Sequence, residues 1–96
     1  MSEPSPNTQI ASDIIRDGLG VELLNDGGEV IAEVFRCDKD QTVVVSYTSA
    51  ISESELQWLL PFAAKTLLQF EDGTALPDPS TWPLVCVSEF WKNPRS

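Results

Sequence analysis

The residues of this sequence that could do chemistry are mainly carboxylates. The stretch "CDKD" places Asp38 and Asp40 two positions apart, as at the start of a calcium-binding loop. Such a loop also needs glycine at its sixth position and Glu at its twelfth, but these positions hold Val43 and Ser49. We therefore expect no metal ion here and interpret these acids as part of a solvated turn.

The sequence offers no nucleophile with a partner to activate it. It contains no histidine, which removes the usual general base near neutral pH and the commonest metal ligand. Cys37 and Cys86 stand alone, without the C-x-x-C spacing of a zinc or redox site. Paired carboxylates catalyse only where a pocket sets their pKa values apart, which is rare for acids in turns. We therefore predict no enzyme activity, no cofactor and no small-molecule ligand.

The charge balance excludes further classes of ligand. Six Lys and Arg residues face fifteen Asp and Glu residues, for a net charge of −9. Such a surface repels phosphate groups and anionic lipid, so we expect neither nucleic acid nor a membrane as partner. The first residues lack the basic and apolar regions of a secretory signal, and the longest apolar stretch, residues 58–64, is interrupted by Pro61. We expect a soluble cytoplasmic protein with reduced thiols.

The length of 96 residues and the 42% hydrophobic content fit one domain. Residues 1–8 are rich in Ser and Pro and are predicted to be a disordered lead. Residues 9–75 form the predicted α+β domain. Residues 76–96 are rich in proline and aromatic residues, which excludes a long helix or a central strand. We expect this segment to pack on the domain or to remain partly flexible, with one short edge strand as an open alternative.

Three segments of the predicted domain alternate apolar and polar residues, as strands do. They are residues 19–24, 29–36 and 42–48, and the first two are joined by "NDGG", which suits a tight hairpin turn. The pattern predicts an antiparallel three-stranded meander. The preceding segment "IASDIIRDGLG" is ambiguous, because Ile10, Ile14 and Ile15 fit a helical turn whereas Asp17 and Gly18 favour a chain reversal. It is predicted to be a short helix or a turn.

An amphipathic helix is predicted to cover one face of this meander. Ser52 and Glu55 form a capping box that should start the helix. An apolar stripe then recurs at intervals of three and four residues: Leu56, Leu59, Leu60, Ala63, Ala64, Leu67 and Phe70. Pro61 either divides this segment into two helices or kinks a single one. The stripe keeps its phase across the proline, so we favour one kinked helix over about residues 53–69, with Gly73 as a stop signal.

The predicted α+β sandwich leaves apolar side chains uncovered on both of its outer sides. Trp58 and Phe62 are four residues apart, so they stack on the helix face opposite the stripe. The sheet face opposite the helix carries a second set: Leu24, Ile31, Phe35 and Val44. The C-terminal segment, with Trp82, Phe90 and Trp91, could cover one of these patches. One tail of about twenty residues is too short to cover both, so one patch should remain for a partner.

The function predicted from these patterns is a small acidic, non-catalytic protein-interaction module. It is expected to form a homodimer or to bind another protein through the uncovered apolar surface. Two alternatives remain open. The first is an inhibitor or immunity-type protein whose carboxylates occupy a basic site on its target. The second is an accessory subunit or an enzyme that uses carboxylates alone.

Overall fold

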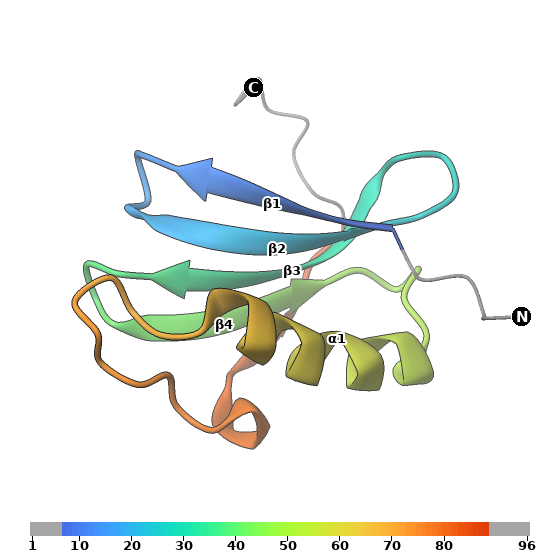
Figure 1. Ribbon diagram of the computed structural model, residues 1–96. Coiled ribbons are helices and arrows are strands. Elements are labelled where there is room, and N and C mark those ends of the chain that lie inside the picture. The colour runs from blue at the N-terminus through green and yellow to red at the C-terminus, as the bar shows by residue number, and fades with distance from the viewer. Residues whose placement is uncertain (1–6, 89–96) are drawn as a thin grey trace, which may run out of the picture.

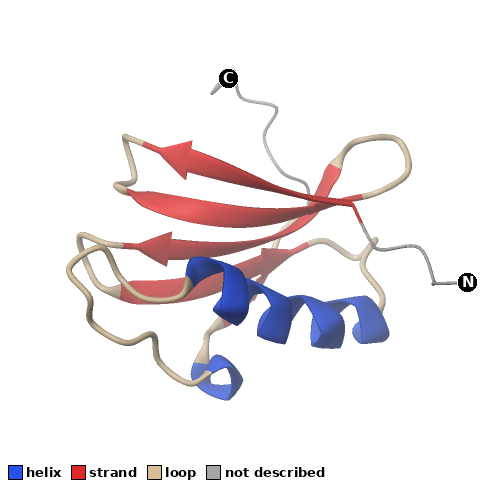
Figure 2. Cartoon of the chain, in the orientation of Figure 1, coloured by secondary structure: helices blue, strands red, loops and turns tan. Residues whose placement is uncertain are grey.

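The computed structural model describes residues 7–88, which form one sheet of five strands with one α-helix packed on it (Figure 1). The elements in chain order are β1 (Asn7–Asp13), β2 (Gly18–Leu24), β3 (Val30–Cys37), β4 (Thr42–Tyr47), α1 (Glu53–Leu67), the 3-10 helix η1 (Pro79–Thr81) and β5 (Leu84–Cys86). The strand order is β1-β2-β3-β4-β5; β1 to β4 form an antiparallel meander, and β5 pairs parallel to β4. The α+β class is therefore confirmed. We call the sheet face that packs against α1 the front face and the opposite one the back face (Figure 2).

The segment expected to be a short helix or turn is a strand followed by a turn. β1 pairs antiparallel with β2 over its whole length, with Ile10 opposite Val21. The helical interpretation is therefore wrong, whereas a chain reversal does occur at residues 14–17, where Asp17 takes a positive φ of 58°. The expected disordered lead included residues 7 and 8, which belong to β1. Residues 1–6 lie outside the described residues.

The core lies between the front face of the central strands and α1. Directly opposed residues of antiparallel strands share a face, so Val21 and its partner Val34 point to the helix together. The buried side chains of this core cluster are Val21, Leu23, Ile31, Ala32, Val34, Val43, Val45, Leu59, Ala63, Leu67, Phe70 and Trp82. The predicted stripe of the helix thus supplies the cover of the sheet.

The helix begins where the capping box predicts. The Ser52 hydroxyl accepts a hydrogen bond from the Glu55 N–H at 3.1 Å, and the Glu55 carboxylate accepts one from the Ser52 N–H at 2.8 Å. A single helix continues through Pro61, as favoured from the sequence. It ends at Leu67 rather than near residue 69. The Arg36 guanidinium donates to the carbonyl oxygens of Leu67 and Gln69 at 3.1 and 2.7 Å, and these bonds satisfy the end of the helix.

The C-terminal segment contributes to the sheet and to the core. β5 is the edge strand that the sequence left as an alternative, and it joins β4 through bonds from Val45 N–H to the Pro83 carbonyl and from Val87 N–H to the Tyr47 carbonyl. The Trp82 side chain is buried, and its indole N–H donates to the Pro77 carbonyl at 2.9 Å. Phe90 and Trp91 lie outside the described residues. Among residues 7–88, no helix has the length and apolar character needed to cross a membrane.

The buried position of Leu59 predicts a large effect of truncation. Leu59 is fully buried between α1 and the sheet, so Leu59→Ala should lower the free energy of unfolding by about 2–5 kcal/mol. Leu68→Ala is the matched control, because Leu68 directly follows the same helix and is 72% exposed. The control should change stability by no more than about 0.5 kcal/mol. Urea unfolding of both variants measures the difference, and equal effects would contradict this packing.

Candidate functional site

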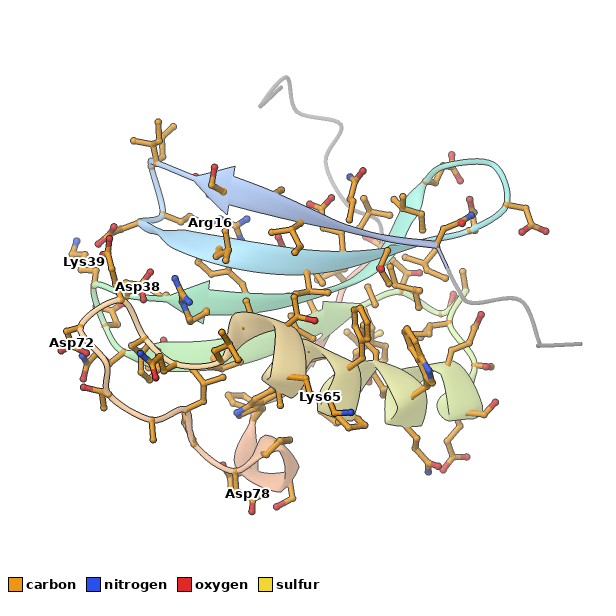
Figure 3. The ribbon with its side chains drawn as sticks, in the orientation of Figure 1. Arg16, Asp38, Lys39, Lys65, Asp72 and Asp78 are labelled. Atoms are coloured by element: carbon orange, nitrogen blue, oxygen red, sulfur yellow. The ribbon has the colours of Figure 1, made fainter. Side chains whose placement is uncertain are left out.

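Three turns meet at one end of the sheet. They are residues 14–17 between β1 and β2, residues 38–41 between β3 and β4, and residues 71–74 after α1. The Asp38 N–H donates to the Asp17 carbonyl at 2.9 Å, and the Asp38 carboxylate accepts from the Glu71 N–H at 2.8 Å. Figure 3 shows Arg16, Asp38, Lys39 and Asp72 gathered at this end. We call it the acidic end.

Further hydrogen bonds fix the turns of the acidic end to one another. The Gln41 side-chain amide donates to the Asp72 carboxylate at 2.7 Å. Arg36, whose guanidinium already holds the end of α1, also forms an ion pair with Asp38 at 3.0 Å. Three segments that are distant in sequence therefore present their carboxylates from one connected framework.

The acidic end carries far more negative than positive charge. The cationic side chains placed there among the described residues are Arg16, Arg36 and Lys39, and both arginines are committed to internal ion pairs. Its carboxylates are those of Asp13, Asp17, Asp38, Asp40, Glu71 and Asp72. This surface should attract a basic partner and repel an acidic one.

The Arg16 side chain turns back from its turn onto the back face of the sheet. Its Nε lies 2.7 Å from the Asp13 carboxylate, and its two terminal nitrogens lie 3.0 and 3.3 Å from the two carboxylate oxygens of Glu33. Its guanidinium carbon lies 3.9 Å from the centroid of the Phe35 ring, as in a cation–π contact. The backbone N–H of Arg16 also donates to Asp13 at 3.0 Å. One side chain therefore fixes the turn and covers part of the back face.

The back face buries two carboxylates that lie directly opposite each other. Glu22 is 2% exposed and Glu33 is 5% exposed, and they pair across β2 and β3. Like charges in this position repel, so each needs a polar partner. Arg16 supplies one for Glu33, and the Gln9 amide donates to Glu22 at 2.6 Å. Gly20 lies in β2, where a Cβ atom would come within 2.8 Å of the Glu33 carboxylate.

The turn that Arg16 anchors exposes two adjacent isoleucines. Ile14 is 94% exposed and Ile15 is 95% exposed, the highest values among the exposed large hydrophobic side chains of residues 7–88. The inward path of Arg16 and its bonds to Asp13 leave these two side chains on the solvent side of the turn. We call Ile14 and Ile15 the isoleucine tip.

The back-face residues predicted as a contact surface are largely covered within the chain. Ile31 is 5% exposed and Phe35 is 7% exposed, while Leu24 and Val44 are half-buried. Phe35 lies opposite Val44 on this face, beneath the guanidinium of Arg16. Phe35 is therefore covered within the described residues, and Ile31 belongs to the buried core cluster, so a partner contact through this set of residues stays a prediction.

The predicted aromatic pair of the helix does stack. The ring centroids of Trp58 and Phe62 are 4.8 Å apart, and the rings are inclined by 16°. Trp58 is 36% exposed, and Phe62 is half-buried against the core.

The carboxylates whose pKa is displaced are unsuited to act as general acids. The backbone N–H and then the side chain of Arg16 lower the pKa of Asp13. The hydroxyl and N–H of Thr74 lower the pKa of Asp72, and the N–H and hydroxyl of Ser80 lower the pKa of Asp78. A general acid at neutral pH needs a raised pKa instead. Within residues 7–88, no three acidic or cysteine side chains are placed to hold a metal ion.

The residues that the sequence interpretation missed are Ile14, Ile15 and Arg16. The signal was present, because two adjacent apolar residues cannot both face one side of a strand. In "SDIIRDG" they are also enclosed by residues that favour turns. The interpretation of these isoleucines as part of a helical turn did not take this conflict into account.

Comparisons of the chain with protein-family models, with curated proteins and with solved structures gave no match. The site must therefore be interpreted from its own geometry.

The lowered pKa of Asp13 predicts how the turn responds to acid. A carboxylate whose folded-state pKa is depressed contributes stability above its unfolded pKa near 3.8, and this contribution is lost as pH falls through the folded-state pKa. Asp13→Asn should therefore be less stable than the wild type at pH 7, and this difference should shrink in strong acid. Urea unfolding of both proteins from pH 7 to pH 2 measures it.

Asp26→Asn provides the control for this comparison, because Asp26 lies in the exposed turn between β2 and β3. Asp26→Asn should change the free energy of unfolding only slightly, and this change should not show the pH dependence expected for Asp13→Asn. A stability difference for Asp13→Asn that stays constant down to pH 2 would contradict the role of the ion pair.

Proposed function

We propose that this chain is a small, acidic, non-catalytic protein-binding module that contacts its partner through the acidic end. The isoleucine tip enters an apolar pocket of the partner, and the surrounding carboxylates pair with basic residues at the rim of that pocket. The observation that carries this proposal is the nearly complete exposure of Ile14 and Ile15 on a turn that Arg16 holds in place.

The energetics of exposed apolar groups support this assignment. Complete burial of an isoleucine side chain contributes roughly 1.5–3 kcal/mol, so two adjacent ones offer a strong anchor. The anchored turn lowers the entropic cost of binding, because the segment is already held by ion pairs before it meets the partner. Single exposed apolar residues are ordinary on protein surfaces, but an adjacent pair at a hairpin tip is not.

The charge distribution supports a basic partner. Both arginines of the described residues make internal ion pairs, so their charges do not offset the carboxylates of the acidic end. Electrostatic attraction should increase the association rate with a basic protein, and salt should reduce it.

The same surface supports an inhibitor as a second candidate function. In that case the carboxylates of the acidic end occupy the basic groove of a target, and the isoleucine tip adds apolar contact beside it. We place either activity in the cytoplasm, because Cys37 and Cys86 are both free thiols.

The experiment compares proteins captured by three immobilised forms of the chain. Ile14→Ser combined with Ile15→Ser should lose a partner that the wild type retains. Leu68→Ser is the control, because it removes an apolar side chain that is 72% exposed and is not part of the isoleucine tip. The purified partner should then bind the double variant at least ~10-fold more weakly, and its association with the wild type should slow as salt increases.

Equal capture by the wild type and the tip variant would refute the tip as contact surface. Loss of binding with Leu68→Ser as well would indicate non-specific apolar adhesion. A salt-independent association rate would remove the role assigned to the carboxylates.

A further inference from the structure

β1 is a long edge strand without the features that normally protect an edge. It has seven residues, and its pairing with β2 runs without a bulge from Asn7 to Asp13. It contains no proline and no lysine, and within residues 7–88 no strand pairs with its outer edge. Exposed edges present unpaired N–H and C=O groups, which proteins usually shield by charge, proline, bulges or shortening.

The opposite edge of the sheet is protected in one of these ways. β5 has only three residues, so it offers few backbone groups for pairing. Of the two edges of the described sheet, β1 is therefore the one that offers a long row of backbone groups for pairing.

The charge of the chain limits which surfaces two copies can share. Each copy carries a net charge of −9, so association is favoured at a contact where few carboxylates meet. β1 meets this condition, because Asp13 at its last position is its one charged residue. The acidic end does not meet it.

We propose that two copies of this chain pair through their β1 strands, antiparallel and about a two-fold axis at Ile10. The five strands of each copy then form one sheet of ten. The two-fold axis runs perpendicular to the sheet, so both helices lie on the same face. This contact goes beyond the proposed function and does not depend on it.

This register matches the residues of β1 with one another. Ile10 is the central residue of the seven, so it faces its own copy, and complete overlap of the two strands is possible. Asp13 then faces Asn7 of the other copy instead of another carboxylate. Thr8 faces Ser12, a pair whose hydroxyls can form a hydrogen bond. The register therefore avoids every pairing of like charges.

Exposed apolar surface on the front face supports the same contact. Ile10 lies opposite Val21, so its side chain is on the front face, where it is 56% exposed. Pairing two Ile10 side chains would bury part of this surface.

The pairing also determines the geometry of the assembly. Antiparallel β1 strands point in opposite directions, so the isoleucine tips lie at opposite ends of the ten-stranded sheet. A dimer would therefore offer two separate tips, each remaining free for a partner.

The experiment uses opposite charges at the two-fold axis. Ile10→Asp and Ile10→Lys each place two like charges in direct opposition, so each variant alone should dimerise at least ~100-fold more weakly than the wild type. An equimolar mixture should recover the dimer, because Asp then faces Lys. Sedimentation over a range of concentrations measures the mass against the 10.6 kDa of one chain, and native mass spectrometry verifies that the recovered species contains one copy of each variant.

Two controls separate this contact from the alternatives. Leu84→Asp introduces the same charge on β5, where Leu84 is 51% exposed, and it should leave the dimer intact. Ile14→Asp tests the isoleucine tip in the same way, and it should also leave the dimer intact while weakening partner capture. The mass of the dimer tests the β1 contact, whereas partner capture tests the isoleucine tip. One proposal can therefore fail without the other.

A wild type that stays monomeric up to millimolar concentration would overturn the proposal. So would a dimer that survives Ile10→Asp, or one that is lost with Leu84→Asp. Recovery by the mixture also shows that both variants fold, since an unfolded chain would not restore a one-to-one complex.

Discussion

The ion pair between Arg16 and Glu33 connects the back face of the sheet to the turn at its end. It gives a buried carboxylate an opposite charge, and the same guanidinium covers the ring of Phe35. Because the Arg16 side chain is directed inward, the neighbouring Ile14 and Ile15 remain in solvent. A contact that stabilises the back face therefore also influences which apolar groups of the turn remain exposed.

On the front face of the sheet, Arg36 likewise connects a packed element to a turn of the acidic end. It ends α1 by binding the last carbonyl groups, and it holds Asp38 at the acidic end. With Arg16 and Arg36 used internally, the described part of the surface carries little positive charge to oppose its carboxylates. Six of these carboxylates are held at the acidic end on a framework of fixed turns.

The two proposed contacts use different parts of β1 and its hairpin. The strand itself is nearly uncharged and suits pairing with an identical strand, whereas the turn that follows is surrounded by acids and suits a basic protein. An exposed strand edge and an exposed apolar tip both carry a risk of aggregation. The high net negative charge offsets this risk by keeping unspecific encounters between copies unfavourable.

Local patterns in the sequence determined much of the fold. The capping box at Ser52 located the start of α1, and the phase of the apolar stripe across Pro61 correctly favoured a single helix. Alternation predicted β2, β3 and β4, because each has one face against the core. The same pattern did not predict β1, because an edge strand with few buried side chains shows no such alternation.

The sequence by itself determined the acidic charge, the amphipathic helix and the central meander, because these follow from composition and from periods of two and of 3.6 residues. Only the tertiary structure decided that Ile31 and Phe35 are covered, and that Ile14 and Ile15 are not. Ile31 is buried in the core cluster, whereas the cover of Phe35 follows from the path of the Arg16 side chain to Glu33, a residue 17 positions away. No local period records a contact between such distant residues, so exposure at this site could not be deduced from the pattern alone.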